Sequence, residues 1–154
     1  GPTLMLYDPS KRWPHGAWHK TGWGAEQVTG DPGFKNGQGK PYLEIVALDE
    51  KADVWEISPV VRLGRFKGYS AIQLGTVECF TSHSEITFEE VAVYGGAFFA
   101  LDRDEGHAVW YYEPNGQCWD EIGSKRGFTN IATFPGHDGG VWAVDAKGNL
   151  WSVF

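Results

Sequence analysis

The sequence predicts an all-β fold built from a repeated sheet unit, and three observations support this prediction. Nearly every apolar segment is four to seven residues long, rich in Val, Ile, Phe, Tyr and Trp, and closed by Gly, Asn, Asp or Pro. Helical periodicity is scarce. An Ala-x-Asp tripeptide recurs along the chain, and each copy is followed by a segment that carries Trp.

The repeat can be followed in order along the chain. Its aspartates are 53 and 43 residues apart, and the segment 88–92 also matches the segment 128–132. Each unit is expected to contain an apolar strand, a turn opened by Asp, a Trp-bearing strand and one or two further strands. The three copies are Ala47-Leu48-Asp49 with Val54-Trp55, Ala100-Leu101-Asp102 with Val109-Trp110, and Ala143-Val144-Asp145 with Leu150-Trp151.

The repeated aspartates are predicted to form turns. An Asp side chain at the first turn position accepts hydrogen bonds from backbone N–H groups two residues on. Gly106 and Gly148 are expected to supply the positive φ of a short hairpin. The 102–106 segment, Asp-x-Asp-x-Gly, also has the oxygen-rich pattern of a calcium loop. Because lysine replaces the second carboxylate in the other copies, a plain turn is the preferred interpretation, and no metal or cofactor is predicted.

Several strands are apolar at nearly every position, which is typical of a sheet covered on both faces. The clearest are 42–48, 97–101 and 109–112. A radial array of small antiparallel sheets satisfies this requirement. We therefore expect residues 1–154 to form a single domain, a β-propeller-like array of about four blades at roughly 40 residues per blade. A β-sandwich or a β-barrel is the alternative.

The repeats at 88–123 and 128–154, with a weaker copy at 42–57, resemble those of tectonin-type β-propeller lectins. The resemblance implies a propeller fold and carbohydrate binding. The segment 62–86 departs from the Ala-x-Asp pattern, and 30–41 reads as a Gly-rich insertion. The matching residues are structural ones, so no sugar-binding position is carried over from the family.

The two ends of the chain suggest how the array closes. The last unit stops at Phe154 without an outer strand, whereas the 6–9 segment followed by Trp18 is similar to the 111–114 segment followed by Trp119. The N-terminal strand is therefore predicted to complete the C-terminal blade, within one chain or between chains, which would cover an exposed edge. A homo-oligomer is one expected form. Gly1-Pro2 looks like the remnant of a cleaved tag, and no localisation is predicted.

Charge and apolar content exclude some classes of partner. The chain has 154 residues, 13 Lys and Arg against 20 Asp and Glu, and a net charge of −7. Nucleic-acid binding is not expected, because the best basic cluster is only Arg62, Arg65 and Lys67. No apolar run is long enough for a membrane helix, so membrane insertion is not expected.

The two cysteines, Cys79 and Cys118, could pair, and the sequence does not decide this. Buried free thiols are the default expectation.

Catalytic motifs are missing from the sequence. There is no Gly-x-Ser-x-Gly, phosphate loop, His-Glu-x-x-His or Cys-x-x-Cys pattern. Neighbouring carboxylates such as Glu89 and Glu90 would point to opposite faces of a strand. We therefore predict a non-enzymatic protein.

Aromatic residues outside the repeat are the candidate ligand-binding residues. Trp55, Trp110, Trp142 and Trp151 are expected to pack in the core at repeat positions. Indoles in Pro- and Gly-flanked segments can stack on a sugar ring while polar neighbours bond its hydroxyls. Packing that clamps a loop is the alternative explanation. The predicted ligand-binding residues are Trp13, Trp18, His19, Trp23, Tyr112 and Asn115.

The predicted function is a lectin-like, carbohydrate-binding module. The alternative is a protein–protein interaction or scaffold domain of a larger assembly, so that the expected partner is a glycan or a protein. A glycosidase is a third and weaker hypothesis, because it would need a cleft with two facing carboxylates.

Overall fold

The computed structural model describes residues 3–7, 18–31, 44–63, 65–80, 84–134 and 140–152. This part of the chain contains 13 strands and no helix, which confirms the all-β prediction. Consequently, no helix in these ranges could cross a membrane.

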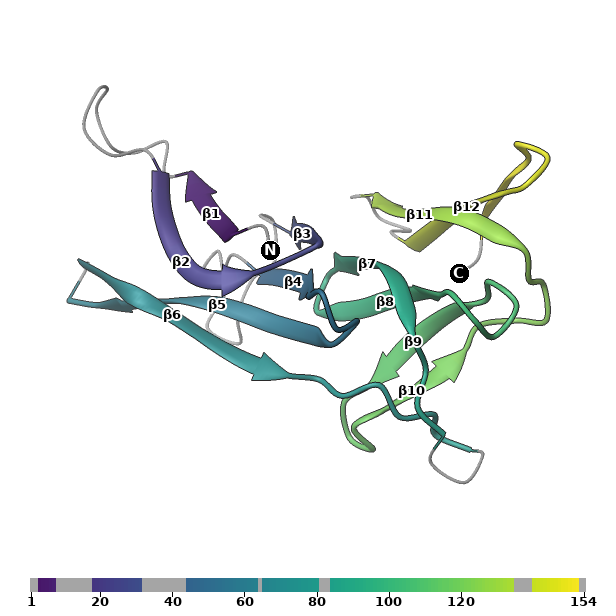
Figure 1. The fold of residues 1–154 in the computed structure, drawn as a ribbon, viewed down its shortest axis with the longest axis horizontal. Coiled ribbons are helices and arrows are strands. Elements are labelled where there is room, and N and C mark those ends of the chain that lie inside the picture. Colours follow the sequence, from purple (N-terminus) through teal and green to yellow (C-terminus); the bar gives the residue numbers. More distant parts are fainter. Residues whose placement is uncertain are drawn as a thin grey trace.

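The strands form four antiparallel sheets (Figure 1). One sheet pairs β1 (Thr3–Tyr7) with β2 (Trp18–Gly24). The first unit contains β3 (Gln27–Asp31), β4 (Glu44–Leu48), β5 (Val54–Arg62) and β6 (Arg65–Gln73), paired in that order. The second unit contains β7 (Phe88–Tyr94), β8 (Ala97–Asp102), β9 (Val109–Glu113) and β10 (Cys118–Glu121). The third unit contains β11 (Phe128–Phe134), β12 (Gly140–Asp145) and β13 (Leu150–Ser152).

Strand register confirms that the three units are copies of one structure. The alanine of each Ala-x-Asp tripeptide lies opposite the repeated tryptophan: Ala47 opposite Trp55, Ala100 opposite Trp110 and Ala143 opposite Trp151. Residues that hold the same register position in different units can therefore be compared directly.

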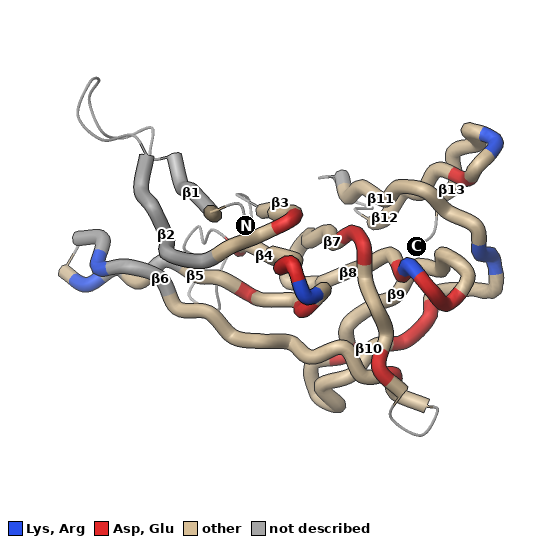
Figure 2. Tube along the Cα trace, in the orientation of Figure 1, with Lys and Arg blue, Asp and Glu red and all other residues tan. Residues whose placement is uncertain are grey.

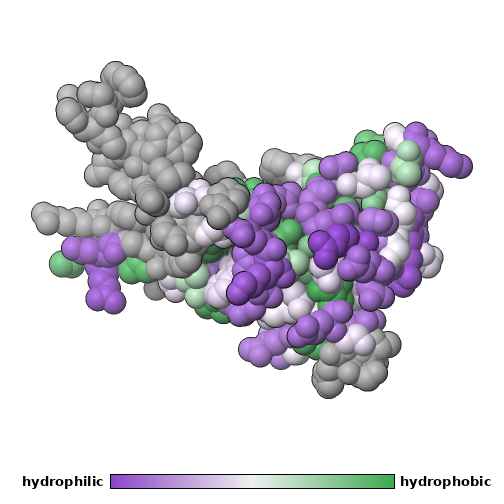
Figure 3. Space-filling view, viewed as in Figure 1, coloured by the Kyte–Doolittle hydropathy of each residue, from purple (hydrophilic) through white to green (hydrophobic). Residues whose placement is uncertain are grey.

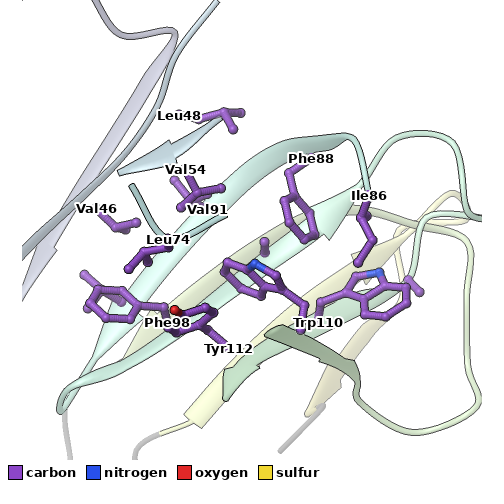
Figure 4. Packing of buried hydrophobic residues seen from close by; sticks show 14 residues of the cluster. Val46, Leu48, Val54, Leu74, Ile86, Phe88, Val91, Phe98, Trp110 and Tyr112 are labelled. Carbon is purple, nitrogen blue, oxygen red and sulfur yellow. The ribbon is translucent and has the colours of Figure 1, made fainter. Parts of the chain in front are cut away.

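The units pack face against face. We call the face of a unit that contacts the preceding unit its leading face, and the opposite one its trailing face. The trailing face of the first unit and the leading face of the second form one hydrophobic cluster, which includes Val46, Leu48 and Val54 with Phe98, Trp110 and Tyr112 (Figure 4). A second cluster joins Phe99, Leu101 and Val109 to Phe128, Ile131, Val141 and Ala143 of the third unit. The second unit is thus apolar on both faces because both faces are covered.

A polar contact between first strands repeats as well. The first strand of the second unit, β7, lies beside the first strands of the other two, β3 and β11. The Val91 N–H of β7 donates to Gln27 Oε1 of β3 at 2.6 Å, and the Ile131 N–H of β11 donates to Glu90 Oε1 of β7 at 3.0 Å. Gln27 and Glu90 hold the same register position, opposite Leu48 and Leu101. One packing geometry therefore relates the first unit to the second and the second to the third.

Cys79 and Cys118 form a disulfide with a Cα–Cα distance of 4.9 Å, so the default expectation of free thiols is wrong. The connection between β6 and β7 folds back along β10, where the Cys79 N–H donates to the Trp119 carbonyl at 3.0 Å and the Trp119 N–H donates to the Val77 carbonyl at 2.8 Å. This parallel pairing aligns the two cysteines, and no short-range sequence pattern predicts it.

The N-terminal strand does not join the third unit of its own chain. In the described part of the chain β1 pairs with β2, so completion of the C-terminal sheet within one chain is wrong. The similarity behind that prediction is nevertheless real at the backbone level, because Tyr7 lies opposite Trp18 as Tyr112 lies opposite Trp119. Among the described residues the third unit has three strands and each of the other two has four, as expected.

Candidate functional site

Each unit contains the same side-chain motif, an Asp carboxylate that binds both a turn and the indole of the next strand. Trp55 Nε1–H donates to Asp49 Oδ2 at 2.9 Å, Trp110 Nε1–H to Asp102 Oδ2 at 2.8 Å, and Trp151 Nε1–H to Asp145 Oδ2 at 3.0 Å. The other oxygen accepts two backbone N–H groups in each case. The prediction that these aspartates form turns is confirmed, and their bond to tryptophan is an addition from the structure.

The turns differ in length but share the predicted backbone geometry. The first and third turns close by a bond between the first and fifth residues, whereas the second turn is two residues longer. Gly106 and Gly148 adopt φ of +92° and +81°, as expected. With both oxygens of Asp102 occupied by its own turn and by Trp110, the 102–106 segment is a hairpin turn rather than a calcium loop. No group of three metal-binding side chains occurs in the described ranges.

The three tryptophans differ sharply in exposure. Trp110 is 2% exposed and Trp55 is half-buried, whereas Trp151 is 41% exposed. The expectation of a core position is therefore confirmed for Trp110 and wrong for Trp151. The cause lies in the connections that precede each unit. Leu74 and Ile86, from the long β6–β7 connection, are buried in the same cluster as Trp110 (Figure 4). The β10–β11 connection is short, and its one apolar residue, Ile122, packs against the second cluster.

Trp151 lines a pocket at the end of the third unit. The pocket has a volume of about 320 Å³ and is also lined by Lys125, Asp145, Lys147 and Asn149. Lys125 Nζ lies 4.5 Å from the Trp151 ring centroid, a cation–π contact. The pocket thus combines an exposed indole with ammonium and amide donors.

The segment that carries Lys125 is held by backbone bonds. The Gly127 N–H donates to the Gly106 carbonyl at 2.9 Å, and the Phe128 N–H donates to the His107 carbonyl at 3.0 Å. Arg126 forms an ion pair with Glu121, which raises the pKa of the guanidinium. This wall of the pocket is therefore positioned by the second unit.

Asp145 remains ionised in this pocket. The hydrogen bond from Trp151 Nε1–H, followed by the bond from the Asn149 N–H, lowers the pKa of Asp145 from 3.8 to about 2. Because its oxygens are used internally, the carboxylate orients the indole, and the two lysines present the outward-facing charge. Figure 2 shows the corresponding blue segments in the β12–β13 turn and in the β10–β11 connection, on a chain whose net charge is −7.

The equivalent position in the first unit is also hollow but has different chemistry. A pocket of about 150 Å³ beside Trp55 and Asp49 is lined by Gly24, Ala47, Ile57 and Ala71. Its walls are mainly apolar, so apart from the motif itself it lacks the polar groups that surround Trp151.

The predicted ligand-binding residues do not come together in the described part of the chain. Trp13 lies outside it. Trp18, His19 and Trp23 lie on β2, where the description covers the backbone and not their side chains. Asn115 is exposed in the turn between β9 and β10, and its N–H donates to Glu113 Oε1 at 3.2 Å.

Tyr112 requires a correction. Its side chain is buried in the core, with its ring centroid 6.4 Å from that of Phe98 and 5.1 Å from that of Trp119. Burial, followed by the charge of Glu56, raises the pKa of its phenol. A ring in this position packs the first two units together and has no open face on which a sugar could stack.

The sequence analysis missed Trp151 as a site residue, although one signal for it was present. The 122–127 connection that precedes the last repeat is short, and Ile122 is its one apolar side chain beside Gly, Ser, Lys and Arg. It therefore offers less apolar cover for the repeated tryptophan of this unit than the β6–β7 connection offers for Trp110. Comparison with known proteins adds nothing to this argument, since no protein family, curated protein or solved structure matches the chain.

Proposed function

We propose that this protein is a carbohydrate-binding module and that the Trp151 pocket is its binding site. The observation that carries the proposal is the difference between two equivalent indoles. Trp110 is buried in the second unit, whereas Trp151 in the third unit is open to solvent among polar donors. An aromatic face stacks on the C–H face of a sugar, while ammonium and amide groups bond its hydroxyls. The pocket volume of about 320 Å³ lies in the range of small-ligand sites.

We further propose that the three units are blades of a β-propeller-like array related to tectonin-type lectins. Two features support this arrangement: the units repeat one packing geometry, and β7 lies beside both β3 and β11. In such an array the repeated tryptophans lie between blades, so a pocket beside one of them is a site between blades.

Glycan-array binding by the purified chain tests the proposed function. Trp151→Ala is expected to weaken binding roughly tenfold or more, the effect of losing one stacking contact together with its buried area. Trp142→Ala is the matched control, because Trp142 is a half-buried indole on the same sheet that points to the trailing face. Trp23→Ala and Trp13→Ala test the locations predicted from sequence.

Each outcome of this experiment has a distinct meaning. Loss of binding with Trp151→Ala and retention with Trp142→Ala support the proposal. Loss with Trp23→Ala or Trp13→Ala alone would place the site at the N-terminal strands. Binding to no glycan would refute the carbohydrate-binding function.

A role in protein–protein interaction is the second candidate. It is favoured by Leu150, a large apolar side chain that is 64% exposed on the trailing face of the third unit.

A further inference from the structure

The walls of the Trp151 pocket carry more positive than negative charge. The charged groups that line the pocket are Lys125, Asp145 and Lys147. Both oxygens of Asp145 are occupied by its own turn and indole. They accept the N–H groups of Lys147 and Asn149 at 2.9 Å, the Asn149 side-chain amide at 3.2 Å and Trp151 Nε1–H at 3.0 Å. A carboxylate has about four lone-pair sites, so these donors fill it, and the two ammonium groups are the charges that the pocket offers to a ligand.

Neither lysine has an ion-pair partner among the described residues. Lys125 Nζ lies over two aromatic rings, 4.5 Å from the ring centroid of Trp151 and 5.8 Å from that of Phe128. Lys147 is exposed in the β12–β13 turn, where Figure 3 shows hydrophilic surface. The ion pairs in the described ranges join Arg103 to Asp104, His107 to Glu89, and Arg126 to Glu121. Both charges are therefore available to an anion in the pocket.

The turn beside this pocket has fewer carboxylates than the equivalent turns of the other units. The turn of the third unit contains one, on Asp145, whereas the others contain three each: Asp49, Glu50 and Asp53 in the first, and Asp102, Asp104 and Glu105 in the second. Lys147 holds the position of Lys51, since each N–H donates to Oδ1 of the aspartate two residues before it. Ala146 takes the place of Glu50. Asn149 takes the place of Asp53 and has a side chain of the same shape without the charge.

The opposite wall of the pocket differs from the second unit by a reversal of charge. Phe88 and Phe128 begin the first strands of the second and third units, each opposite the aspartate of its own unit. The residue three positions earlier is Glu85 in the second unit and Lys125 in the third. The unit with the exposed tryptophan thus has a basic residue where the unit with the buried tryptophan has an acidic one.

We propose that the Trp151 pocket selects glycans that carry an anionic group, a carboxylate or a sulfate ester, which pairs with Lys125 and Lys147. This inference rests on the proposed carbohydrate-binding function and names its substrate class. Ammonium groups form stronger hydrogen bonds with ionised oxygens than with neutral hydroxyls. The chain has a net charge of −7, but at physiological ionic strength repulsion from carboxylates more than about 8 Å away is largely screened. The two lysines in the pocket therefore outweigh the distant acidic residues.

A glycan array that pairs each neutral sugar with its uronate and with its sulfate ester tests the inference. Comparison of the two acidic forms distinguishes a carboxylate from a sulfate. The unmodified chain is expected to bind at least one acidic form roughly tenfold more tightly than the neutral form, the combined effect of two exposed ion pairs. Raising the NaCl concentration from about 0.01 M to about 1 M should weaken binding of the acidic form and leave binding of the neutral form nearly unchanged.

Substitutions in the turn separate the charge from the rest of the pocket. Lys147→Gln is expected to weaken binding of the acidic glycan about fivefold, and Lys147→Arg should retain most of the affinity. Lys51→Gln is the matched control, because Lys51 holds the same turn position in the first unit, outside the pocket. Ala146→Glu should bind the acidic glycan more weakly than Ala146→Gln, since these two variants differ in charge and hardly in size.

The outcomes separate this inference from the proposed function. Preference for acidic glycans that is lost in Lys147→Gln and kept in Lys51→Gln supports the inference. Equal binding of neutral and acidic forms would overturn it while leaving the carbohydrate-binding function in place. Preference that survives in the Lys125→Gln/Lys147→Gln double variant would also overturn it. Binding to no glycan would refute the proposed function, and the inference with it. Thermal unfolding verifies that each variant is folded before its binding is interpreted.

Discussion

Replacing Asp102 by alanine removes the acceptor that holds the second turn and the core indole, and the cost follows from its four bonds. Asp102 Oδ2 accepts the Ala108 N–H and Trp110 Nε1–H, both at 2.8 Å and both buried. Each buried donor left without a partner costs about 1–3 kcal/mol, so the pair accounts for about 2–6 kcal/mol. Oδ1 accepts two further N–H groups, from Glu105 and His107. Both residues are exposed, so their amides can bond water instead, and their loss adds less to the destabilisation.

The other two units supply matched comparisons for this substitution. Asp49→Ala removes the acceptor of a half-buried indole and should cost about 0.5–1.5 kcal/mol for that bond. Asp145→Ala should cost least, because Trp151 is open to water. The expected order of destabilisation is therefore Asp102, then Asp49, then Asp145.

Urea unfolding of the oxidised protein, followed by far-UV circular dichroism, measures the three free energies of unfolding. If the second unit does not fold without Asp102, asparagine replaces alanine at all three positions, because its amide keeps one acceptor oxygen. The same order of destabilisation is then expected, with smaller losses in the free energy of unfolding. Equal costs at the three positions, or the largest cost at Asp145, would refute the argument that burial of the indole sets the value of the motif.

Three further predictions concern the disulfide, a glycine and acid. Replacing Cys79 and Cys118 together by alanine should lower the free energy of unfolding by about 4 kcal/mol, the chain-entropy value for a closed loop of about 40 residues. A change below about 1 kcal/mol in urea unfolding would contradict this prediction. Gly116→Ala should lower the free energy of unfolding by about 1–3 kcal/mol, because a Cβ there would lie 2.9 Å from Cys118 Sγ. Most of this loss should vanish when the same substitution is made in the Cys79→Ala/Cys118→Ala protein. The Trp151 indole N–H resonance should titrate with a midpoint near pH 2, the lowered pKa of Asp145. The stabilisation from this bond is then complete above about pH 4 and is lost as the pH falls through 2. A midpoint near 3.8 would show that the bond does not form.

Local chemistry made much of the repeat predictable. Asp followed by Gly and then by a Trp-bearing strand is a short-range pattern, because an Asp side chain bonds backbone groups two to six residues ahead. The same proximity brings Asp145 to Trp151 across a single turn. Strand alternation then placed the alanines and tryptophans on one face, as the register shows.

Long-range pairing was not predictable in the same way. The disulfide depends on a connection that folds back along β10, and nothing near Cys79 in the chain specifies that path. The burial of Tyr112 depends on Phe98 and Trp119, and on a preceding unit that contributes Val46 and Val54 to the same cluster. The polar and aromatic composition of the segment around Tyr112, taken alone, predicted an exposed recognition edge.

By itself, therefore, the sequence determined the strands, the repeat and the turns, because each arises from interactions between residues a few positions apart. Only the tertiary structure decided which copies of the repeat are covered and which are open. Equivalent residues such as Val54, Val109 and Leu150 have similar local sequences, and their exposure depends on whether another sheet follows in space. The Trp151 pocket and the open trailing face both follow from that difference.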